Sequence, residues 1–179
     1  VFYESRVVNL KLDEATLQRI DAEYDQMAEE AEEYAIEKSK RELARIDSLL
    51  GADETINSLV VDILTHYKDD CQYEQTGTAM IVAYSRPIAM KIYQRILQLR
   101  PLWTEKVAVV MTSGNQDPEE WRPIIGNDTH KKELEKRFKD NDSPLKIAIV
   151  VDMWLTGFDV PSLSTMYVFK PMAGHNLMQ

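Results

Sequence analysis

The sequence predicts a three-layer α/β domain with a mainly parallel sheet, preceded by a helical segment. One observation is a change of texture: residues 13 to about 70 contain a single glycine and no proline, whereas short apolar runs alternate with helical patterns from Thr78 onward. The other is the spacing of those runs. Strands separated by helices of about a dozen residues pair in parallel through right-handed crossovers. We therefore divide the chain into residues 1–12, 13–76 and 77–179.

The helical segment shows an apolar seam at alternating spacings of three and four residues. It comprises Leu17, Ile20, Tyr24, Met27, Ala31 and Tyr34. The pattern slips between residues 36 and 42 and resumes at Leu43, Ile46 and Leu50. Gly51 is expected to end this helix, and Asp53 to cap a second one. The apolar face of the second helix is Ile56, Leu59, Val60, Ile63, Leu64 and Tyr67. Residues 1–12 fit either a strand or an extended linker.

The remainder reads as four strands joined by helices, with strands expected at 79–84, 107–111, 147–151 and 165–169. Ser85 is expected to cap a helix that carries Pro87 in its first turn and ends at Pro101. This helix should bury Ile88, Ile92, Ile96 and Leu99. A polar loop containing Pro118, Pro123 and Gly126 follows, and then a helix capped by Asp128 or Thr129, with Leu134 and Phe138 facing inward. A last helix is expected near Gly174.

Composition restricts the classes of function. The formal net charge of −9 opposes bulk attraction to DNA, so any DNA contact must be local or aided by other parts of a longer protein. Apolar runs span about six residues, too short for a transmembrane helix. The single cysteine, Cys71, excludes an internal disulfide and multi-cysteine zinc sites, which fits a reducing cytoplasm. No glycine-rich phosphate loop occurs, and His66, His130 and His175 lack metal-ligand spacing.

Three loops follow predicted parallel strands, at the sheet edge where this fold class binds ligands. Ser85 and Arg86 offer a hydroxyl, a guanidinium and helix-start N–H groups to a phosphate, although a plain N-cap with a surface arginine is also compatible. Thr112 and Ser113 offer two hydroxyls, and the same loop could be an ordinary turn.

The third loop is residues 152–161. Asp152 at the strand tip could simply order its own loop through hydrogen bonds to backbone N–H groups. Thr156 and Gly157 permit close approach to a phosphate, and Asp159 could accept a hydrogen bond from a ribose hydroxyl.

The motifs in these loops resemble a known family. Residues 152–161, DMWLTGFDVP, resemble motif V of superfamily 2 helicases, and residues 79–86 resemble their motif IV strand and loop. Residues 129–138 match the helix before motif V. A closer resemblance is to the motor (R) subunit of type I restriction enzymes, and it extends along nearly the whole chain. The segments that carry it are residues 2–6, 82–86, 152–161 and 170–179.

The resemblance implies a second RecA-like motor domain, truncated at its carboxyl end. In such enzymes, ATP with Mg²⁺ binds between two RecA-like lobes, and hydrolysis drives double-stranded DNA past the protein. It assigns Gly157, Asp159 and Gln179 (where motif VI would begin) to the nucleotide. It assigns Ser85, Arg86, Thr112, Ser113 and Thr156 to the DNA backbone. We expect this segment itself to hold no metal ion.

The implied partners are DNA, the specificity and modification (methyltransferase) subunits, and the first RecA-like domain of the same chain. The implied location is the cytoplasm, with no membrane. Val151 and Thr156 depart from motif V, which often has threonine and arginine at these positions. Because the phosphate loop and the motif VI arginines are both missing from the segment, we expect it not to hydrolyse ATP by itself.

Two alternatives stay open. The seam of residues 17–34 could dock a partner helix, with the α/β part as scaffold of a non-catalytic interaction module. The chain could also belong to a superfamily 2 DNA remodeller outside restriction systems. A G-x-x-x-x-G-K-[ST] motif upstream and paired arginines shortly after Gln179 would establish the motor.

Overall fold

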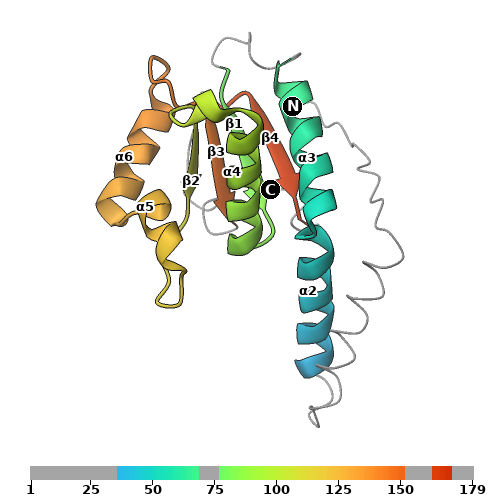
Figure 1. Cartoon of the computed structure of the whole chain (residues 1–179). Coiled ribbons are helices and arrows are strands. Elements are labelled where there is room, and N and C mark those ends of the chain that lie inside the picture. Colours follow the sequence, from blue (N-terminus) through green and yellow to red (C-terminus); the bar gives the residue numbers. More distant parts are fainter. Residues whose placement is uncertain (1–35, 69–76, 152–162, 171–179) are drawn as a thin grey trace. The chain divides into compact units, whose positions relative to one another are not determined.

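A computed structural model describes residues 36–68, 77–151 and 163–170 of the 179-residue chain (Figure 1). The chain forms two compact units, Val1–Asp62 and Ile63–Gln179. The predicted domain boundaries stay predictions. So do the seam of residues 17–34, the segment 1–12 and the helix near Gly174, which lie outside the described residues.

The helical segment contains α2 (Ile36–Leu50) and α3 (Asp53–His66). Helix α2 runs unbroken through residues 36–42, where the apolar pattern slips, because slippage of a face does not interrupt the backbone hydrogen bonds. The predicted end at Gly51 is confirmed by its N–H, which donates to the Asp47 carbonyl at 2.8 Å. Asp53 lies inside the first turn of α3 rather than before it. All six residues of the predicted apolar face, Ile56, Leu59, Val60, Ile63, Leu64 and Tyr67, are buried.

The predicted α/β fold class is confirmed by a four-stranded sheet in the order β2-β3-β1-β4. Its strands are β1 (Ala79–Ala83), β2 (Val107–Val110), β3 (Ile147–Val151) and β4 (Thr165–Phe169), each within one residue of its predicted bounds. All three pairings are parallel. Ile81 lies between Ile149 and Tyr167, which fixes the register of the three adjacent strands.

The helices and 3₁₀ turns of this unit are α4 (Arg86–Leu99), η2 (Pro101–Trp103), η3 (Glu119–Trp121), α5 (Arg122–Ile125) and α6 (Asp128–Lys139). The sequence predicted only a polar loop where η3 and α5 lie, since neither element is long enough to show periodicity. The predicted cap of α6 is wrong. Asp128 and Thr129 are already helical, whereas Asn127 has the extended backbone that a cap needs, and its Oδ1 accepts from the His130 N–H at 2.9 Å.

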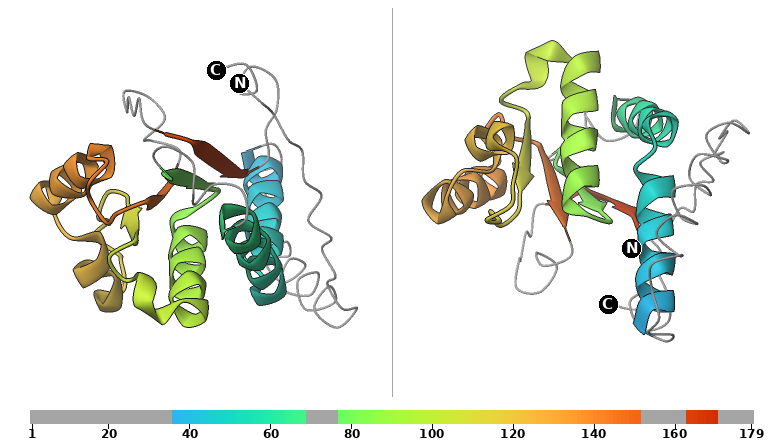
Figure 2. Two further views of the ribbon diagram at one scale, coloured as in Figure 1. Left: turned by 90° about the horizontal axis from the view of Figure 1, so that it is seen from above. Right: turned by 60° about the horizontal axis from the view of Figure 1, so that its bottom comes forward.

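The sheet lies between two helical layers (Figure 2). On one face, α6 contributes Leu134 and Phe138, as predicted, to a buried cluster with strand residues Met80, Val82, Val110, Ala148 and Val150. On the other face, α4 buries Ile88, Ile92 and Ile96, whereas the predicted Leu99 is only partly buried. Successive residues of a strand point to opposite faces of the sheet, and both faces are covered by helices. The strands are therefore apolar on both faces, as a doubly covered sheet requires. Within the described residues, every helix is too short or too polar to cross a membrane.

The end of α3 and the residue after it are tied to the sheet by aromatic contacts. The Tyr67 hydroxyl, fully buried, donates to the Gly77 carbonyl at 2.7 Å, ahead of β1. The Lys106 ammonium, just before β2, lies 4.9 Å from the centroid of the Tyr67 ring and 4.4 Å from that of Trp103. Burial, and secondarily the charge of Lys146, lowers the pKa of Lys106. His66 Nδ1 lies 2.7 Å from the Tyr167 hydroxyl on β4.

Candidate phosphate-binding edge

The carboxyl ends of the strands lie at one edge of the sheet. Ala83 of β1 pairs with Val151 of β3, and Val110 of β2 pairs with Val150 of β3. The loops that begin at Tyr84 and Met111 therefore leave the same edge. Since β3 lies between β1 and β2, their ends are separated by about 10 Å, two interstrand spacings. Asp152, Thr156, Gly157, Asp159 and Gln179, assigned from the sequence to this edge or to the nucleotide, lie outside the described residues.

Ser85 is the N-cap of α4, as the sequence predicts. Its backbone is extended (φ −142°), and its Oγ accepts from the Ile88 N–H at a long 3.5 Å. Pro87 lies in the first turn, where its missing N–H costs no helical hydrogen bond. The cap fixes where the helix starts and therefore where Arg86, its first residue, leaves the backbone.

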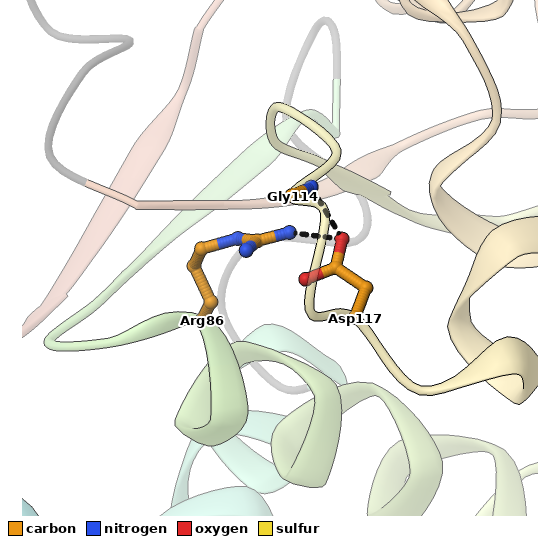
Figure 3. A network of polar contacts seen from close by, with 3 residues as sticks. All are labelled: Arg86, Gly114 and Asp117. Carbon is orange, nitrogen blue, oxygen red and sulfur yellow. Dashed lines mark hydrogen bonds and ion pairs between the residues drawn. The ribbon is translucent and has the colours of Figure 1, made fainter.

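Arg86 reaches from the start of α4 to the loop that follows β2 (Figure 3). Its Nη2 donates to Asp117 Oδ2 at 2.5 Å, and the same carboxylate oxygen accepts from the Gly114 N–H at 2.6 Å. One oxygen thus joins the first predicted phosphate loop to the second. Thr112 and Ser113, the hydroxyl residues of that second loop, are exposed beside this junction.

The Asp117 carboxylate is the least exposed member of this cluster. Its side chain is 7% exposed, whereas that of Arg86 is 32% exposed. The hydrogen bond from Arg86 is the main cause that lowers the pKa of Asp117, and the Gly114 N–H and the charges of Arg86 and Arg122 act in the same direction against the opposing effect of burial. The side chain is therefore an anion at neutral pH that already has two N–H donors.

Packing restricts the guanidinium further. A Cβ on Gly114 would lie 2.6 Å from Arg86 Nη1, so only glycine allows this approach without displacing the side chain. The Trp121 ring of η3 lies 6.0 Å from the guanidinium carbon, at the outer limit of a cation–π contact. Arg86 Nε is buried and has no hydrogen-bond partner among the described residues.

The ion pair predicts a pH dependence. Because the folded-state pKa of Asp117 is below its ordinary 3.8, its contribution to stability is fully present above that value and is lost as the pH falls through the folded pKa. The difference in free energy of unfolding between the wild type and Asp117→Asn should be constant from about pH 5 to 7 and shrink below about pH 4. Urea unfolding at a series of pH values measures it. A difference that grows in acid would contradict the assignment.

The sequence did not single out Asp117 or Trp121. The pair Asp117-Pro118, three residues after Gly114, could have indicated a turn. An aspartate before proline is typical of turns, in which its carboxylate accepts hydrogen bonds from backbone N–H groups. Nothing along the chain connects it to Arg86, 31 residues earlier. Only the shared edge of β1 and β2 brings them together.

Among the described residues, only the position of the end of β3 fits a site for ATP and Mg²⁺. Strand β3 ends at Val151, so the loop predicted to face the nucleotide begins at the same edge as Arg86 and Thr112. Among the described residues, no group of three or more His, Cys, Asp and Glu side chains is placed to hold a metal ion. This part of the molecule supplies the edge at which a nucleotide could lie, and the predicted nucleotide contacts come from other residues.

The fold and this edge define a parallel α/β domain with loop-borne cationic and hydroxyl groups at the carboxyl ends of its strands. Residues 104–179 match the family model described as type I restriction enzyme subunit R domain 3. The chain is 40% identical over its whole length to a protein of Methanocaldococcus jannaschii named as the endonuclease subunit of the type I restriction enzyme MjaIXP, and covers 17% of that relative. Over 88% of the chain it is 37% identical to the type I restriction enzyme HindI endonuclease subunit of Haemophilus influenzae, and covers 15% of it.

The family resemblance inferred from the motifs is thereby confirmed: the chain belongs to the R (endonuclease) subunits of type I restriction enzymes. It spans less than a fifth of the length of these curated relatives, 17% of one and 15% of the other.

Proposed function

We propose that the chain supplies the second motor lobe of an ATP-dependent, DNA-translocating R subunit, acting in the cytoplasm with specificity and methyltransferase subunits. The observation that carries this proposal is the common edge of β1, β2 and β3, where Arg86, Thr112 and Ser113 gather. Parallel α/β sheets bind ligands outside the carboxyl ends of their strands, especially where neighbouring crossovers leave to opposite faces. Here α4 leaves β1 toward one face, and α6 follows β2 on the other.

The chemistry of the edge suits a phosphodiester backbone. The Arg86 guanidinium and the exposed hydroxyls of Thr112 and Ser113 are donors, and donors of these kinds make many of the contacts to DNA phosphates. We propose that they contact phosphates and not base edges, so the expected binding is independent of sequence. This agrees with a motor lobe whose target site is chosen by another subunit.

ATP, when bound, would supply the free energy for movement through hydrolysis of its terminal phosphate. We propose that Gly157, Asp159 and Gln179 touch it and that Thr156 contacts DNA. Asp152 would order the loop between them. Val151, the last residue of β3, can offer a phosphate only its backbone, because its side chain has no hydrogen-bonding group.

Arg86→Ala tests the DNA side of the proposal. The variant should bind double-stranded DNA more weakly and equally so for all sequences, and its plot of log affinity against log salt should flatten by up to about one unit, since one phosphate contact is lost. Fluorescence anisotropy of a labelled duplex across a salt series measures both quantities on the full polypeptide that carries this chain.

Arg100→Ala is the matched control. Arg100 is the C-cap at the opposite end of α4 and is exposed, with its guanidinium carbon 6.0 Å from the centroid of the Trp103 ring. Its loss therefore removes the same charge far from the carboxyl edge. Equal losses in both variants would mean that only bulk charge matters. If Arg86→Ala binds DNA with unchanged affinity, the proposed contact of Arg86 with the DNA backbone is wrong, and a non-catalytic interaction module is favoured.

A further inference from the structure

Arg86 is held by an anion of its own chain at the position where DNA is proposed to bind. The contact joins one guanidinium nitrogen to one carboxylate oxygen, Nη2 to Oδ2, and is not the two-bond fork that makes arginine–carboxylate pairs strongest. The pair is therefore strong enough to fix the side chain and leaves other donors of the guanidinium uncommitted to Asp117.

The two partners differ in how easily they can move. Asp117 is 7% exposed and also accepts from the Gly114 N–H, so its carboxylate is fixed to the loop after β2. Arg86 is 32% exposed and lies on a flexible stem. An incoming phosphate can reach the guanidinium, whereas the carboxylate cannot follow it outward. Exchange of one anion for the other needs movement of Arg86 alone.

We propose that Asp117 is a positioning residue that holds Arg86 at the strand edge and competes with DNA phosphate for its guanidinium. The inference rests on the proposed function of Arg86. In the absence of DNA the pair has no net charge, so Arg86 adds little to long-range attraction. A chain with a net charge of −9 and a paired arginine should hold the backbone weakly enough to release it between steps.

The charge-neutral variant Asp117→Asn separates positioning from competition. Its amide oxygen can still accept from Arg86 and Gly114, while the competing charge is gone. We expect about three- to tenfold tighter binding of double-stranded DNA at low salt, the reverse of a simple loss of structure. The salt dependence should steepen by up to about one unit. Asp117→Ser, also neutral and able to accept from Gly114, should shift affinity in the same direction.

Controls separate this proposal from its alternatives. Asp142→Asn removes an equal charge in the turn before β3, at the opposite edge of the sheet, and should leave binding near the wild-type value. In an Arg86→Ala background, Asp117→Asn should have no effect, because the competition needs both partners. An effect that persists there would show direct repulsion of DNA by Asp117 and overturn the proposal.

The DNA contact of Arg86 and the competition from Asp117 give different experimental outcomes. If Arg86→Ala leaves DNA binding unchanged, the proposed function of Arg86 is wrong. If Arg86→Ala weakens binding but both neutral variants of Asp117 bind as the wild type does, or more weakly, then only the competition is wrong. Thermal melting of each variant confirms that it is folded before its affinity is compared.

Discussion

Replacing Phe138 with alanine is expected to destabilise the α/β unit by about 3–5 kcal/mol, the range found when a buried aromatic ring is removed and a cavity remains. The Phe138 side chain is fully buried, in the cluster that joins α6 to the sheet through Met80, Val82 and Leu134. The strand side of the cavity cannot collapse, because its residues are fixed by the register of the central strands. Urea unfolding with an unchanged m-value measures the loss.

Leu102→Ala is the control for this substitution. Leu102 is also large and apolar but is 95% exposed on η2, so truncating it should change the free energy of unfolding by no more than about 0.5 kcal/mol. A loss below about 1 kcal/mol for Phe138→Ala would contradict the packing of α6 on this face.

Replacing Gly126 with alanine is expected to cost at least about 1–3 kcal/mol from its backbone alone. Gly126 ends α5 with φ +66° and ψ −159°, a region that residues with a Cβ rarely adopt. An added Cβ would also lie within 2.5–2.7 Å of three side-chain atoms of His130. His130 is in the first turn of α6 and one of the three atoms is its own Cβ, so either the backbone at Gly126 or the start of α6 must shift to make room.

Gly114→Ala is the matched control, because Gly114 does not have a positive φ and its Cβ would meet mainly the far end of the Arg86 side chain. It should cost clearly less stability than Gly126→Ala in the same chemical unfolding experiment. Equal losses would show that the conformation of the loop after α5 is not the source of the penalty.

The sequence predicted the architecture well, for physical reasons that can be traced to particular residues. The runs from Ala79 and Ile147 are buried along the sheet, so they are continuously apolar and easy to find. The face from Ile56 to Tyr67 repeats at helical spacing and is buried. The order of the strands in the sheet was not predicted. The apolar runs of β1 and β3 are similar, and no local sequence pattern specifies which strands are adjacent.

The candidate site was only partly predictable. Loops after strands could be placed at one edge by topology, which brought Arg86 and Thr112 into the same region. The partner of Arg86 could not be found this way, because Asp117 lies in a polar loop whose path depends on η3 and α5. Cap positions were also less certain, as the displacement from Asp128 to Asn127 shows, since several neighbouring residues have side chains able to cap.

The attachment of the last turn of α3 has a mechanical consequence. His66 is joined to the edge strand through Tyr167, and Tyr67 to the approach of the central strand through Gly77. A pull on this end of the helix would be shared between the edge strand β4 and the residues that lead into the central strand β1. Force applied there would reach the sheet without first unravelling a loop.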